Sequence, residues 1–182
     1  MRDVSMILSQ LELALLGGLP LHTLDQLIAS RCAPVYARPQ SRRVACYTLH
    51  EAVMLTTGVL LHERSGLGWP LIHHALALNP ELFVDPLDEA DGATGLEERW
   101  LAVYDGPRSA SVGRLAELAR PDQAQPVFLV SLSEAIWLVR QRAEKFGLVL
   151  PEPGQWGAAL DAYLTETTAR LAHEASPWAE AA

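Results

Sequence analysis

Residues 48–66 read TLHEAVMLTTGVLLHERSG and carry a start signal, an apolar face and a stop signal for one helix. Thr48 and Glu51 have the spacing of a capping box, in which the threonine side chain accepts from a helical amide and the glutamate reaches back to the cap. Gly66 can adopt the left-handed conformation that ends helices. The apolar stripe of this helix consists of Leu49, Val53, Leu55, Val59 and Leu60. We therefore predict a helix that begins after Thr48 and ends at Gly66.

Two shorter helices are expected before this one. Within Asp3–Leu16, apolar residues recur at three- and four-residue spacing, and Gly17-Gly18 stops the pattern. Pro20 separates this segment from Leu21–Arg31, in which Thr23 is the candidate cap of a second helix.

A basic hairpin is expected between the second helix and residue 48. Cys32–Tyr47 contains two short extended arms on either side of the basic tip Arg38–Arg42. Beyond Gly66, Pro70 suits the first turn of another short helix, which Asn79-Pro80 closes. These elements together form an N-terminal unit that spans residues 1–79.

This order of helix, basic hairpin, capped helix, glycine break and short helix resembles the winged helix of the mercury-resistance regulator (MerR) family. The resemblance covers Leu21–Leu78. The residues that carry it are Arg43, Tyr47, Thr48, Glu51, Leu55, Leu60, Leu61, Gly66, Ile72 and Leu76. It implies that double-stranded DNA is the ligand, that an Arg/Tyr wing grips phosphate, and that the helix after the wing packs against a helix-turn-helix.

The candidate DNA-binding residues are therefore Arg31, Arg38, Arg42, Arg43 and Tyr47. Arginine suits phosphate because its planar guanidinium donates two parallel hydrogen bonds and never loses its charge. Such contacts position a protein on a duplex without reading its sequence.

The helices before the hairpin depart from the family pattern. The family has two helices there, and the second one enters the major groove. Only Cys32–Val35 separates the Leu21–Arg31 helix from the hairpin, and Pro34 lies within it. Either the recognition helix is shortened, or Asp3–Leu16 and Leu21–Arg31 form the pair. The second option leaves Arg31 on the reading helix, with few polar side chains to contact bases.

Charge is distributed unevenly along the chain, whose net charge is −8. Residues 1–79 hold six arginines and five acidic residues, a balance of +1, whereas residues 80–182 carry −9. Four arginines fall between Arg31 and Arg43, a stretch without any acidic residue. A nucleic-acid contact is therefore expected in the N-terminal half, and a protein contact is the alternative for the acidic half.

The C-terminal unit, residues 80–182, is expected to mix strands and helices. Phe83–Leu96 is acidic and is the expected boundary loop. Strands are predicted at Trp100–Tyr104 and Pro126–Leu132, and a short helix at Val112–Arg120. Ser133 is the expected cap of a helix that ends before Gly147, and a final helix is expected at Gln155–Ala175. The predicted fold class is mainly α with short β elements, an α+β fold.

Composition and motifs argue against several classes of protein. Apolar residues make up 49% and charged residues 20% of the chain, which is typical of folded proteins. There is no apolar run of membrane-spanning length and no signal-peptide pattern, and the two cysteines favour a reducing compartment, so a cytoplasmic protein is expected. Metal-ligand spacing, a nucleophile elbow and a glycine-rich phosphate loop are missing, so neither a cofactor nor an enzyme activity is expected.

Two hypotheses follow. The first is a homodimeric DNA-binding transcriptional regulator of prokaryotic or phage type. The second is a non-enzymatic interaction module or adaptor that binds a protein partner through its acidic half, and in that case the hairpin arginines are simply solvated.

Overall fold

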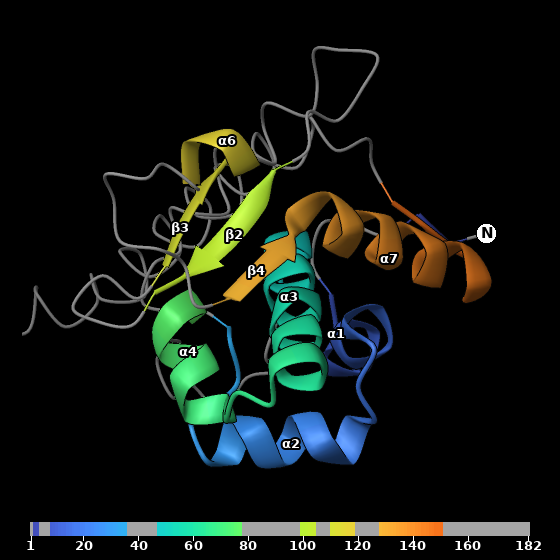
Figure 1. The fold of residues 1–182 in the computed structure, drawn as a ribbon. Coiled ribbons are helices and arrows are strands. Elements are labelled where there is room, and N and C mark those ends of the chain that lie inside the picture. Colours follow the sequence, from blue (N-terminus) through green and yellow to red (C-terminus); the bar gives the residue numbers. More distant parts are fainter. Residues whose placement is uncertain are drawn as a thin grey trace, which may run out of the picture.

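The computed structural model describes residues 2–3, 8–35, 47–77, 99–104, 110–118 and 128–150. Among these residues the chain is mainly helical, with a small antiparallel sheet, so the predicted α+β class is confirmed. In Figure 1 the helix α3 stands at the centre, the sheet lies at one end of the molecule and α2 crosses the other end. The expected hairpin tip and the expected helix Gln155–Ala175 lie outside the described residues.

The first helix is shorter than predicted. α1 spans Gln10–Gly17 rather than starting at Asp3, because a capping box of Ser9 and Glu12 sets its first turn. Arg2–Asp3 is instead the strand β1, which pairs in parallel with β5, Leu148–Val149. An apolar spacing that suits a helix was therefore overridden near the N-terminus by a capping signal and by strand pairing.

The second helix, α2, spans Leu21–Ala29 and confirms the prediction in position but not in its cap. Pro20 is the residue that precedes the helix, and no side chain caps it, so the expected role of Thr23 is wrong. Proline serves well here because it lacks the amide hydrogen that the first turn leaves unpaired.

The third helix, α3, spans Leu49–Ser65 and has the predicted ends. Thr48 and Glu51 form both halves of the capping box, and Gly66 adopts a left-handed conformation at φ +69°. The fourth helix, α4, spans Trp69–Ala77 with proline in its first turn, as predicted.

The C-terminal half supplies a three-stranded sheet. β2 (Trp100–Val103) is its central strand, with β3 (Ala110–Gly113) and β4 (Phe128–Ser131) antiparallel on either side. Both predicted strands are present. The helix predicted at Val112–Arg120 starts too early, because Val112 and Gly113 belong to β3; of its described residues, 112–118, only those of α6, Leu115–Leu118, are helical.

The last described helix, α7, spans Leu132–Lys145. Its cap is Ser131, whose hydroxyl accepts from the amide of Glu134 at 3.1 Å, so the expected cap Ser133 is wrong by two residues. Gly147, at φ +67°, follows the helix as predicted.

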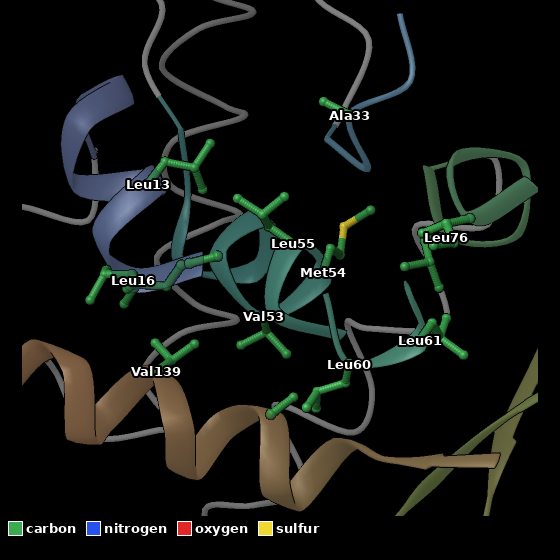
Figure 2. Packing of buried hydrophobic residues seen from close by; sticks show 14 of the residues in the cluster. Leu13, Leu16, Ala33, Val53, Met54, Leu55, Leu60, Leu61, Leu76 and Val139 are labelled. Atoms are coloured by element: carbon green, nitrogen blue, oxygen red, sulfur yellow. The ribbon is translucent and has the colours of Figure 1, made fainter. Parts of the chain in front are cut away.

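The core is organised around α3. Every residue from Leu49 to Leu61 is buried, not only the predicted stripe, because α1, α4, α7 and β4 all contact this helix. Figure 2 shows Leu13 and Leu16 of α1 and Val139 of α7 packed around it. One hydrophobic cluster therefore includes residues from both predicted units. The expected boundary at residues 79 and 80 lies outside the described residues.

Within the part of the chain that the structure describes, no helix is both long and apolar enough to cross a membrane.

Candidate nucleic-acid interface

α1 and α2 are joined by a three-residue turn, Gly18-Leu19-Pro20. Gly18 adopts the left-handed conformation at φ +78°, and the amides of Gly18 and Leu19 both donate to the carbonyl of Ala14, at 2.9 and 3.0 Å. A short turn that contains glycine is typical of the helix-turn-helix. Leu21–Ala29 contacts α1, which is the contact that the second of the two arrangements left open by the sequence requires.

α2 buries one face and exposes the other. Leu24 and Leu27 are buried in the core, whereas His22, Asp25 and Gln26 are exposed. The Asp25 carboxylate accepts from Nε2 of Gln10 at 2.5 Å, which ties α2 to the first residue of α1. The solvent face of α2 therefore carries polar side chains beside the exposed residues Leu21 and Ala29, and the Gln10 contact links it to α1.

Arg31 lies just beyond the end of α2 and is exposed. Its backbone adopts a left-handed conformation at φ +57°, which is uncommon for a residue other than glycine, and its amide donates to the carbonyl of Ile28 at 3.0 Å. This turn ends the helix earlier than predicted and leaves Arg31 exposed just after α2.

The chain that leaves α2 is held firmly against α3 and α4. The amides of Cys32 and Ala33 donate to the carbonyl of Leu27, and the carbonyl of Ala33 meets Nδ1 of His73 at 2.7 Å. Pro34 is buried so close to Gly58 that a Cβ there would lie 3.1 Å from its ring. The start of the predicted hairpin is therefore anchored by α3 and α4.

The end of the predicted hairpin is anchored too. Tyr47 is only 3% exposed, and its backbone exchanges two hydrogen bonds with Leu8, at 2.7 and 2.8 Å. Tyr47 is thus a core residue in the described structure, and it fixes the segment that precedes α3. Arg38, Arg42 and Arg43 lie outside the described residues.

The exposed residues His22, Asp25 and Gln26 were missed as site candidates by sequence reasoning. A signal was present, because Leu24 and Leu27 already mark the buried face of the helix. Which residues of α2 face solvent became clear only from the packing of α2 against α1.

The described residues contain no group of three side chains able to hold a metal ion. No protein-family model matches the chain, and a search of curated proteins found no significant relative.

Proposed function

We propose that this protein is a DNA-binding transcriptional regulator of prokaryotic or phage type, similar to the MerR family. The observation that carries the proposal is the pair α1 and α2, joined at Gly18, with the polar face of α2 exposed. An α-helix presented in this way fits the major groove of duplex DNA.

The exposed side chains of α2 have the chemistry that base edges require. Gln26 can donate to and accept from adenine, Asp25 can accept from the amino group of cytosine, and His22 can take either role. The short polar stretch and the acidic residue favour modest sequence preference, so most of the affinity comes from phosphate contacts.

The phosphate contacts are assigned to the arginines of the wing. Along the sequence, Arg31 precedes the anchored turn at Pro34, and Arg38, Arg42 and Arg43 follow it. The anchored ends at Ala33 and Tyr47 support a wing whose two ends are fixed close to the helix-turn-helix. Regulators of this type bind as dimers with two half-sites one DNA turn apart, and a homodimer is part of the proposal.

The test is an anisotropy titration of the full chain against mixed-sequence duplex DNA at two salt concentrations. About four arginines on phosphate predict that a fourfold rise in salt lowers the affinity by more than about a hundredfold. An affinity that does not change with salt concentration would contradict the proposal.

Charge reversal locates the contact. The double substitution Arg42→Glu and Arg43→Glu is expected to abolish binding. The matched control is Arg114→Glu with Arg140→Glu, which changes the net charge equally on exposed residues of the C-terminal half. Equal loss of binding in both variants would show that net charge, rather than the wing, governs the affinity.

A second function is favoured by one observation. Trp137 of α7 is 56% exposed beside a hollow lined by Arg140, Glu144 and Leu148. Exposed tryptophans are enriched at protein interfaces. Under this alternative the protein is an interaction module, and Trp137→Ala weakens partner binding while the wing variant leaves it unchanged.

A further inference from the structure

The guanidinium of Arg142 reaches from α7 into the helix-turn-helix. Its Nη1 donates to the carbonyl oxygen of Leu16 at 2.9 Å and to Oγ1 of Thr56 at 3.2 Å. The Thr56 hydroxyl in turn donates to the same Leu16 carbonyl at 3.3 Å. One arginine of the C-terminal half thus closes a three-residue network with the last turn of α1 and the middle of α3.

The Leu16 carbonyl needs these donors. The last four carbonyls of an α-helix have no partner within the helix. The two amides that follow α1, those of Gly18 and Leu19, both donate to Ala14 instead. The side chains of Arg142 and Thr56 therefore supply the hydrogen bonds that the backbone does not.

The turn itself is shaped to admit the guanidinium. A Cβ at Gly18 would collide with the guanidinium carbon and nitrogens of Arg142. Burial lowers the pKa of Arg142 and the nearby Glu63 carboxylate opposes this shift, and an arginine stays charged throughout. A positive charge at the C-terminal end of α1 is also favoured by the helix dipole.

The opposite surface of α7 is open to solvent. Arg140, Glu144 and the exposed Trp137 lie there, whereas Ala135, Val139 and Ala143 pack into the core. α7 lies beside α3, from its middle to its last turn, and beside α1, and in Figure 1 α2 lies at the opposite end of the molecule. Arg142 is thus a polar link from this outer helix to the turn that orients α2.

We propose that Arg142 is a positioning residue for DNA binding, which sets the orientation of α2 by holding the Leu16–Gly18 turn, so that α7 and the DNA-reading helix are coupled. This inference rests on the proposed function, because the orientation of α2 affects function only if α2 binds DNA. Arg142 itself touches no DNA.

The first experiment measures amide hydrogen exchange in the full-length Arg142→Met variant, which keeps the apolar stem and removes the donors. Amides of Gly18 and Leu19 are expected to exchange about tenfold faster, since a hydrogen bond from a charged donor is lost. Exchange in the centre of α3 should stay at the wild-type rate. The control is Arg140→Met, an equal loss of charge two residues away on the exposed face.

The second experiment measures DNA affinity as a function of salt. Arg142→Met is expected to weaken binding about tenfold without changing the salt slope, because no phosphate contact is removed. Arg142→Lys, which keeps a charge and enough donors for both oxygens, should restore affinity to within about threefold. A merely space-filling arginine would show the opposite order, with methionine tolerated better than lysine.

The outcomes separate the two proposals. Wild-type exchange rates at the turn in Arg142→Met overturn the positioning role, whatever the protein binds. Faster exchange at the turn in Arg142→Met, combined with a wild-type chain that shows no DNA affinity, retains the link between α7 and α1 but removes the proposed function. If Arg142→Met exchanges faster yet binds DNA as tightly as wild type, the coupling to α2 is wrong.

Discussion

Arg64 and Glu134 form a two-pronged ion pair between the last turn of α3 and the first turn of α7. Nη1 of Arg64 lies 2.7 Å from Oε2 of Glu134, and Nη2 lies 2.5 Å from Oε1. Each charge also complements its own helix, with a cation near the C-terminal end of α3 and an anion near the N-terminal end of α7. This pair and the Arg142 network join α7 to the N-terminal helices at two separate points.

The ion pair is expected to contribute little to stability. Arg64 is 54% and Glu134 35% exposed, so solvent screens their attraction. A double-mutant cycle with Arg64→Gln and Glu134→Gln should give a coupling energy of about 0.5 kcal/mol in chemical denaturation. A coupling of several kcal/mol would contradict the view that the pair is solvated.

The same pair predicts a pH dependence. The hydrogen bonds from Arg64 hold the pKa of Glu134 below its usual value, and partial burial opposes this shift. The contribution of Glu134 is therefore complete above its unfolded pKa of about 4.3 and is lost as the pH falls through the lower folded value. The stability difference between wild type and Glu134→Gln should shrink below about pH 4. A difference that grows on acidification would show that the sign is wrong.

Gly18→Ala should be more destabilising than Gly66→Ala. Both glycines have positive φ, and alanine is strained at either position by about 1 kcal/mol. Nothing lies within 4 Å of a Cβ at Gly66, whereas a Cβ at Gly18 meets the guanidinium of Arg142. Thermal unfolding should therefore show an additional cost of about 1 kcal/mol or more at Gly18. Equal losses in the two variants would mean that Arg142 moves aside freely.

Leu55→Ala tests the packing of α1 on α3. Leu55 is fully buried, and its side chain occupies the space that a Cβ on Gly17 would need. Truncation should cost about 2 to 5 kcal/mol because it leaves a cavity. Leu11→Ala on the exposed side of α1, where the side chain is 52% accessible, should change stability by less than about 0.5 kcal/mol. Similar losses at both positions would contradict the described packing.

Thr48→Val tests the capping box of α3. The valine has the same shape but cannot accept from the amide of Glu51, so a loss of about 1 to 2 kcal/mol is expected. The control is Thr57→Val, because the buried Thr57 hydroxyl donates to the carbonyl of Val53, which belongs to its own helix. That substitution should cost about 0.5 kcal/mol or less, since the carbonyl keeps its helical partner. A larger loss at residue 57 than at residue 48 would refute the capping role.

The sequence correctly predicted those elements that depend on residues only a few positions apart. The box of Thr48 and Glu51, the stop at Gly66 and the strand at residues 100–103 depend on residues within a few positions, and all are present. The errors arose where two local signals competed. Ser9 overrode the apolar spacing that begins at Asp3, and Ser131 overrode Ser133 as a cap, because a strand that enters the helix places the earlier serine at its end.

The candidate site was only partly predictable. Arg31 and the arginines of the expected wing were proposed from charge and resemblance, while the exposed face of α2 required knowledge of the surface that Leu24 and Leu27 cover. The contact between α1 and α2 could not be predicted, because the spacing of apolar residues shows which face of a helix is buried but not which helix covers it.

The ends of α3, the strands β2 and β4 and the fold class thus followed from the order of residues, since capping, periodicity and turn chemistry act over three or four positions. The burial of every residue from Leu49 to Leu61 in α3, the burial of Tyr47 and the contact of Arg142 with Leu16 depended on the assembled fold. The last of these joins positions 126 residues apart. No periodic pattern specifies such a partner, because the donor acquires it only when α7 has packed on α1 and α3.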